Sequence, residues 1–223
     1  MTQFANAQEE FAELFAIWRN EGVTPLTAVI QGAKALLDSQ AGELNKDQRQ
    51  LLEMIYRKGL RAAECWHSPS DYIHLRYGKV REEWASVRLK EVISHALSHL
   101  KEYTHTENIK VDLPDNLPPV RANSYLSRVF VYLFDSPPLR YYIVDYPAIL
   151  KATLNNLTNI TVQIYIEQRF ESEFKDQAHF FYPGSRASIA QLIVRQHGSE
   201  LQMRSIDEGI EIQFELPIWS EHH

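Results

Sequence analysis

The chain has 223 residues, of which 44% are hydrophobic, so it can bury the core of one large domain or of two small ones. Its 23 Lys and Arg against 29 Asp and Glu leave a net charge of −6, which gives no general attraction to nucleic acid or to an anionic membrane. The single Cys65 cannot close an intramolecular disulfide, and no segment reaches the ~18 apolar residues of a membrane span. We therefore expect a cytoplasmic protein that binds neither nucleic acid nor membrane.

The first third of the chain has a helical pattern. Apolar residues recur at intervals of three and four from residue 4 to about residue 37, which predicts a long amphipathic helix that bends near Pro25. Residues 39–43 break this pattern, and a second helix is predicted from about residue 45, with Asn45 as its N-cap. Pro69 disfavours an unbroken helix through residue 68, and Gly78 ends the helical part.

Two helices alone cannot bury both of these apolar stripes. The economical solution is a four-helix bundle made from two copies of the hairpin, which predicts a homodimer.

From residue 79 onward, short strands and helices are mixed. Strands are predicted at residues 84–87, 109–113, near 120, 160–166, 201–206 and 210–216, and helices at residues 89–100, 124–134 and 187–197. The stretch with Tyr141, Tyr142, Ile143 and Tyr146 is ambiguous. We therefore predict two domains, a helical hairpin at residues 1–78 and an α+β domain at residues 79–223 with helices on one face of a mixed sheet.

Several segments together carry a family resemblance. In chain order they are residues 20–26 (NEGVTPL), 87–89 (VRL), 108–114 (NIKVDLP), 117–123 (LPPVRAN), 188–198 (SIAQLIVRQHG) and 214–217 (FELP). Along essentially its whole length the chain resembles the dimerisation and ATP-binding core of a two-component sensor histidine kinase. The resemblance implies a dimeric helical hairpin followed by an α/β sandwich of the histidine-kinase type.

The positions that carry the family's chemistry have changed. Asn20 stands where the family has its phosphate-accepting histidine, and a carboxamide nitrogen is not nucleophilic. Tyr132 and Ser136 replace the two asparagines expected to hold the magnesium nucleotide. Residues 160–183 contain no glycine, and Arg186 lies where the second glycine of the phosphate loop is expected. The resemblance therefore implies a degenerate kinase with no catalytic residue and no bound ATP or Mg²⁺.

Two features survive in the hairpin. In the family, the residue at the position of Thr24 orients water for hydrolysis of an aspartyl phosphate on a receiver domain, and Glu21 precedes it. The alternative is that Thr24 and Pro25 only shape the bend and that Glu21 is a solvated helix residue. The second helix carries an excess of positive charge, which would steer the acidic pocket of a receiver, although such a charge run is also typical of a solvated face. Its basic residues are Lys46, Arg49, Arg57, Lys58 and Arg61, against Asp47 and Glu53.

The resulting hypothesis is a catalytically degenerate, histidine-kinase-like homodimer without a cofactor. It would bind or modulate a response-regulator receiver domain or a partner kinase through Asn20, Glu21, Thr24, Arg57 and Arg61. The alternatives are a receiver phosphatase that uses Thr24, a kinase or phosphotransferase with activity left, and an unrelated ligand-binding α+β protein.

Overall fold

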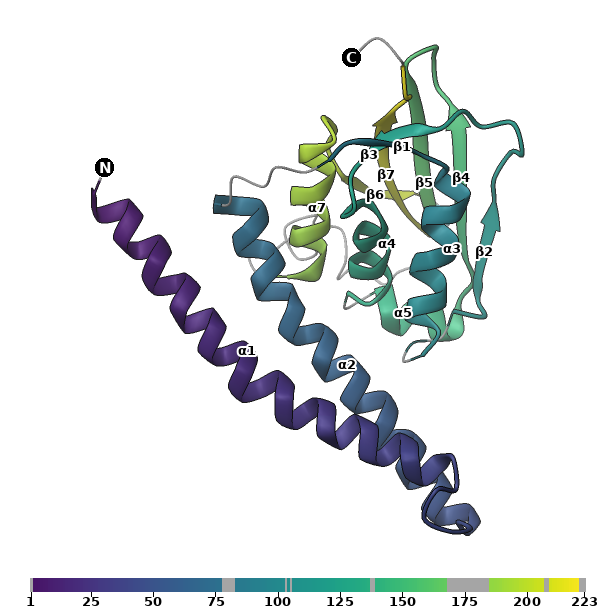
Figure 1. The fold of residues 1–223 in the computed structure, drawn as a ribbon. Helices are drawn as coiled ribbons and strands as arrows, with labels where there is room; N and C mark the ends of the chain where they lie inside the picture. The colour runs from purple at the N-terminus through teal and green to yellow at the C-terminus, as the bar shows by residue number, and fades with distance from the viewer. Residues whose placement is uncertain are drawn as a thin grey trace. The chain divides into compact units, whose positions relative to one another are not determined.

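The computed structural model describes residues 2–77, 83–102, 104, 106–136, 139–167, 185–206 and 209–220. The chain divides into two compact units, Met1–Gly78 and Lys79–His223 (Figure 1).

The first unit is an antiparallel hairpin of two long helices, α1 (Thr2–Leu37) and α2 (Lys46–Tyr77) (Figure 1). The helices come close where Gly59 of α2 meets Ile30 of α1. A Cβ atom built on Gly59 would lie only 2.8 Å from Cγ1 of Ile30, so a side chain there would force the helices apart. The glycine therefore permits the close packing of the hairpin.

The start of α2 is fixed by a reciprocal pair of hydrogen bonds. The backbone N–H of Gln48 donates to Oδ1 of Asn45 at 2.9 Å, and the backbone N–H of Asn45 donates to Oε1 of Gln48 at 3.0 Å. This is a capping box, in which two otherwise unpaired donors of the first turn are satisfied. The predicted N-cap at Asn45 is confirmed.

Both helices continue through a proline. Pro25 lies inside α1 and Pro69 lies inside α2. The sequence disfavoured an unbroken helix through residue 68 but allowed the helix to continue beyond it, and α2 does continue to Tyr77. A proline removes one backbone donor and costs about 3 kcal/mol, which a long helix can offset by its remaining turns and packing. The Ser68 hydroxyl also donates to the Glu64 carbonyl at 3.3 Å, so this turn keeps a side-chain hydrogen bond.

The second unit is an α+β fold, as predicted. Its elements in chain order are β1 (Ala85–Val87), α3 (Leu89–Leu100), β2 (Ile109–Asp112), β3 (Val120–Ala122), α4 (Leu126–Phe134), α5 (Leu139–Asp145), β4 (Ala148–Leu154), β5 (Asn159–Glu167), α7 (Arg186–Gln196), β6 (Gln202–Ile206) and β7 (Gly209–Pro217). The helix α5 resolves the ambiguous stretch, and β4 is a strand that the sequence pattern did not predict.

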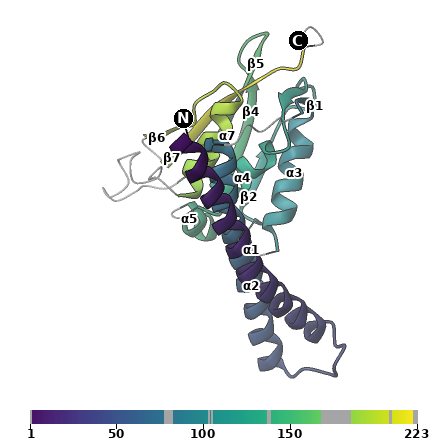
Figure 2. The ribbon, with the colours of Figure 1, turned by 60° about the vertical axis from the view of Figure 1, so that its left-hand side comes forward.

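Five of the described strands form one mixed sheet in the order β2-β4-β5-β7-β6. Strand β2 runs parallel to β4, and the other neighbours are antiparallel. Strands β1 and β3 form a separate antiparallel pair, which an isolated bridge from Val120 to Ile218 extends. Helices α3, α4 and α7 cover one face of the large sheet (Figures 1 and 2).

The core lies between these helices and the sheet. On β5 the alternating residues Ile160, Val162, Ile164 and Ile166 are all 0% exposed, as their spacing predicted. On α4 almost every side chain is buried, because this helix packs against α3 on one side and α7 on the other.

Candidate functional site

The C-terminal end of α4 meets the N-terminal end of α7 around one buried carboxylate, that of Asp135. The Asp135 side chain is 0% exposed. Its Oδ2 accepts a hydrogen bond from Nη1 of Arg186, and its Oδ1 lies 3.4 Å from Nη1 of Arg140. We call Asp135, Arg140 and Arg186 the Asp135 cluster. It joins the end of α4 and the neighbouring helix α5 to the start of α7, which lies about 50 residues further along the chain.

Tyr132 fills the space next to this cluster. Its side chain is almost fully buried, and the Arg186 guanidinium lies 5.8 Å from the centre of its ring. Its hydroxyl accepts a hydrogen bond from Nη1 of Arg128 at 3.4 Å. The aromatic ring and the guanidinium together occupy the region between the two helix ends.

The first turn of α7 is closed by its own serines. The Ser185 hydroxyl oxygen accepts from the backbone N–H of Ser188 at 3.1 Å, and the Ser188 hydroxyl donates to the Ser185 carbonyl at 2.7 Å. At the end of α4 the Ser136 hydroxyl donates to the Leu133 carbonyl at 2.6 Å. These polar groups thus bind local backbone.

Sequence reasoning singled out Tyr132, Ser136 and Arg186 but missed Asp135 and Arg140. The structure brings Tyr132, Asp135, Arg140 and Arg186 together. Arg140 gave no signal, because its helix lies in the stretch whose pattern was ambiguous. The loop expected around Gly184 and most of the glycine-free segment lie outside the described residues.

The hairpin residues of the hypothesis lie on two faces. Asn20, Glu21 and Thr24 are exposed on α1, with Asn20 and Thr24 one turn apart on the same side. On α2, Arg57 is exposed and Arg61, one turn further on, is half-buried. These arginines flank Gly59 by two residues on either side, a rotation of about 200°, so they point away from α1.

The hairpin also exposes a row of apolar side chains. Ile30 and Gly59 mark the sides of the two helices that face each other. Counting about 100° per residue from these two positions places the exposed apolar side chains on one flank of the hairpin. We call this set the apolar flank. Its members and exposed fractions are Val29 (52%), Leu36 (37%), Leu51 (56%), Met54 (51%) and Ile55 (42%).

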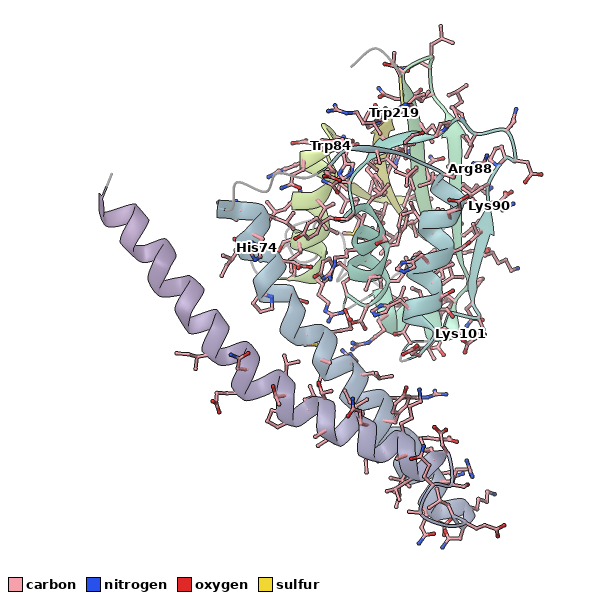
Figure 3. The ribbon with its side chains drawn as sticks, viewed as in Figure 1. His74, Trp84, Arg88, Lys90, Lys101 and Trp219 are labelled. Atoms are coloured by element: carbon pink, nitrogen blue, oxygen red, sulfur yellow. The ribbon has the colours of Figure 1, made fainter. Side chains whose placement is uncertain are left out.

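A second buried polar group lies at the other end of α7. His197 Nδ1 lies 2.8 Å from the Ile193 carbonyl, and Nε2 lies 3.5 Å from the backbone N–H of Asn123. These contacts fit a neutral ring with its proton on Nδ1. The ring packs edge-on against Trp84, which is labelled in Figure 3, and the two ring centres are 5.0 Å apart. Burial lowers the pKa of His197, the nearby Arg121 lowers it further, and the bond to Ile193 opposes both.

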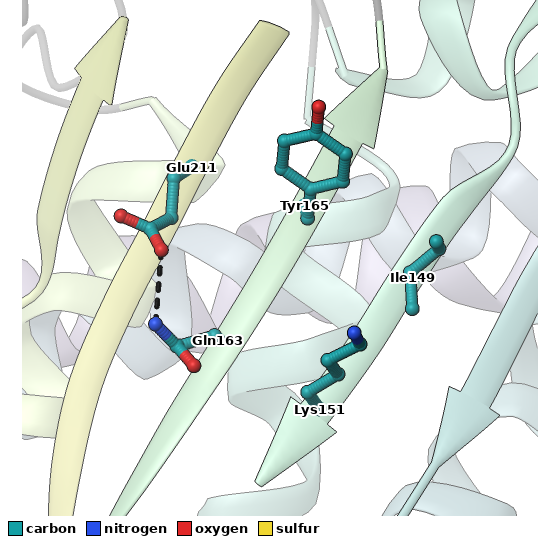
Figure 4. A pocket seen from close by; sticks show the side chains of 5 residues that line it. All are labelled: Ile149, Lys151, Gln163, Tyr165 and Glu211. Carbon is teal, nitrogen blue, oxygen red and sulfur yellow. Dashed lines mark hydrogen bonds between the residues drawn. The ribbon is translucent and has the colours of Figure 1, made fainter. Parts of the chain in front are cut away.

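The open face of the sheet carries a shallow hollow of about 310 Å³ (Figure 4). Its lining comes from three neighbouring strands and comprises Ile149, Lys151, Gln163, Tyr165 and Glu211. The Gln163 amide donates to Glu211 at 2.9 Å, and Arg204 forms an ion pair with the same carboxylate. The hollow is thus a mixed surface in which the acidic group is already neutralised.

The described part of the chain has neither a helix that could span a membrane nor a cluster of metal ligands. None of its helices is both long enough and apolar enough to cross a membrane. No group of three His, Cys, Asp or Glu side chains in that part is placed to hold a metal ion.

No protein-family model matches the chain, and no curated protein matches its sequence. Several solved structures do resemble it. Full-length ShkA in complex with AMPPNP has a TM-score of 0.62 at 14% identity, over 93% of this chain and 46% of the ShkA chain. The histidine kinase AdeS of Acinetobacter baumannii has a TM-score of 0.53 at 14% identity, over 90% of this chain and 98% of AdeS.

The histidine kinase ThkA in complex with the response regulator protein TrrA has a TM-score of 0.56 at 15% identity. That match covers 98% of this chain and 67% of the ThkA chain. All three matches extend over both the helical hairpin and the α+β unit. The chain therefore has the fold of a histidine-kinase core.

Proposed function

We propose that the chain is a cytoplasmic, catalytically degenerate, histidine-kinase-like signalling protein. As a homodimer it binds the receiver domain of a response regulator, or a partner kinase, and does not phosphorylate itself. The observation that carries this proposal is Asn20, which is exposed on α1 where the family places its phosphate-accepting histidine. A carboxamide at that position has no lone pair available to attack a phosphate.

The α4–α7 region supports the loss of nucleotide binding. The family's site would hold Mg²⁺ with oxygen ligands and the phosphates at a helix N-terminus. Here both oxygens of Asp135 are engaged by guanidinium groups, and Ser185 caps the first turn of α7. The Tyr132 ring lies against Arg186 in the same region. These residues do not fit a magnesium triphosphate, so we propose that the chain uses no such cofactor.

The apolar flank of the hairpin supports the homodimer. Removing exposed apolar surface from water is favourable, and the same flank of a second hairpin offers a matching surface. Light scattering at micromolar concentration should give the mass of a dimer. Leu51→Glu combined with Ile55→Glu should give a monomer, whereas Gln40→Glu in the turn should not. A monomeric wild-type chain would contradict the bundle.

Two arginines of α2 support docking of an acidic receiver. Arg57 is exposed and Arg61 is half-buried, and both lie on the side of α2 opposite the contact of Gly59 with α1. Charged side chains of this kind steer a partner of opposite charge and fix its orientation. Among the similar structures, ThkA was solved together with a response regulator.

Capture of purified receiver domains tests the docking surface. We expect the double reversal Arg57→Glu and Arg61→Glu to weaken capture at least tenfold. The matched control, Lys90→Glu with Lys110→Glu, makes the same change of charge at exposed positions of the other unit and should bind like the wild type. Unaltered capture by the arginine variant would rule out this surface.

Phosphatase activity on a phosphorylated receiver is the second candidate. It is favoured by Thr24, which is exposed on the same side of α1 as Asn20. Such a reaction requires a positioned water rather than a nucleophilic side chain. If Thr24→Ala leaves receiver dephosphorylation unchanged, this candidate is excluded.

A further inference from the structure

We propose that Arg186 is a built-in cation that clamps α4 to α7 in the absence of any ligand. Through this clamp the α+β unit keeps one arrangement of these helices at every nucleotide concentration. The inference rests on the proposed loss of nucleotide binding and identifies what takes the place of the nucleotide.

The positions of the two charges in their helices give the first argument. Arg186 is the first residue of α7, and Asp135 is the C-cap residue of α4. The N-terminus of a helix carries partial positive charge and the C-terminus carries partial negative charge. Each side chain therefore has the charge that its own helix end disfavours. Pairing Arg186 with Asp135 across the two ends removes both conflicts at once.

Burial gives the second argument. The Asp135 side chain is 0% exposed, and the side chains of Arg186 and Arg140 are 10% and 11% exposed. By contrast, the ion pair of Lys90 with Asp115 is 70% and 93% exposed, and such surface pairs contribute little. A buried carboxylate that loses one of its two cations stays in a medium that solvates it poorly. Removing either member of the pair is therefore costly.

Covalent tethering gives the third argument. A ligand that bridges two helices stabilises them by an amount that depends on its free concentration. An arginine on α7 is always present beside its carboxylate, so its effect does not depend on the solution. The Arg140 guanidinium adds α5 to the same clamp, 3.4 Å from the other oxygen of Asp135.

Thermal unfolding of the full chain, followed by hydrogen exchange in α4 and α7, tests the clamp. We expect Arg186→Ala and Asp135→Asn each to lower the melting temperature of the α+β unit by roughly 10 °C and to speed exchange in both helices. Lys90→Ala, which breaks the exposed pair, should change the melting temperature by less than about 2 °C. If both cluster variants melted at the same temperature as the control, the proposal would be overturned.

Chemical rescue separates the cation from simple packing. Millimolar ethylguanidinium should restore part of the lost melting temperature in Arg186→Ala, where Asp135 remains, and none in Asp135→Asn. Absence of rescue in Arg186→Ala would contradict a role for the positive charge.

Addition of magnesium and AMPPNP to the wild-type chain is the last test. It should leave the melting temperature of the wild-type chain unchanged, and a clear rise would contradict both the clamp and the proposed loss of nucleotide binding. Receiver capture is scored separately, because it depends on the hairpin. Failure of capture with an intact clamp would contradict only the docking function.

Discussion

Adding one methyl group at Gly59 tests the packing of the hairpin directly. The new Cβ would lie 2.8 Å from Cγ1 and 3.7 Å from Cδ1 of Ile30. Carbon atoms in contact are separated by about 3.5–4.0 Å, so the side chain must move by about 0.7 Å. Overpacking of this kind costs about 1–3 kcal/mol, while the helix propensity of Ala over Gly returns about 0.8–1.0 kcal/mol. We expect Gly59→Ala to destabilise the hairpin by about 1 kcal/mol.

The contact with Ile30 predicts a change of sign in a double-mutant cycle. In an Ile30→Ala background Cγ1 is gone, so the same glycine substitution should stabilise by about 1 kcal/mol. Urea unfolding followed by far-ultraviolet circular dichroism measures both effects. Gly32→Ala is the matched control on α1, because a Cβ there meets no atom within 4 Å and only helix propensity acts. If Gly59→Ala stabilised the wild-type chain as much as Gly32→Ala does, the reasoning would be refuted.

Three further results are expected. Burial holds the pKa of His197 below its ordinary value of 6.5. As the pH falls, the imidazole is therefore protonated in the unfolded chain before it is protonated in the folded chain. The contribution of His197 to stability should be complete above pH 6.5 and decline as the pH falls further, and His197→Gln should flatten that decline in urea titrations. Asn45→Ala should lower the free energy of unfolding of the hairpin by about 0.5–2 kcal/mol. If it lowered this free energy by less than a substitution at an uncapped surface position does, the capping box would be contradicted. Asn20→His should still not accept phosphate from ATP, because the proposed clamp between α4 and α7 remains; phosphorylation of that variant would contradict the proposed loss of nucleotide binding.

Periodicity predicted the elements whose local pattern and burial agree. The strand around residues 160–166 was predicted because its four isoleucine and valine positions alternate and all face the core. Strand β4 was missed because its inward positions include the small residues Ala148 and Ala152, which have low β-propensity. It forms a strand because β2 and β5 pair with it on either side, and that pairing is tertiary.

The site was predictable only in part for a similar reason. Asn20, Tyr132, Ser136 and Arg186 were singled out because a resemblance supplied the residues expected at their positions. The bond from Arg186 to Asp135 spans 51 residues of sequence, and no local pattern predicts such a pair. The charges of Arg186 and Asp135 gave no signal either, because a helix N-terminus usually favours an acidic residue and a helix C-terminus a basic one.

Incubation of the purified chain with Mg²⁺ and ATP carrying a radioactive γ-phosphate tests the central claim most directly. Asn20 offers no nucleophile, and the region between α4 and α7 is filled by its own side chains. We therefore expect no covalent label on the polypeptide under conditions that label an active histidine kinase run in parallel. Radioactive phosphate bound covalently to this chain would contradict the proposed loss of autophosphorylation.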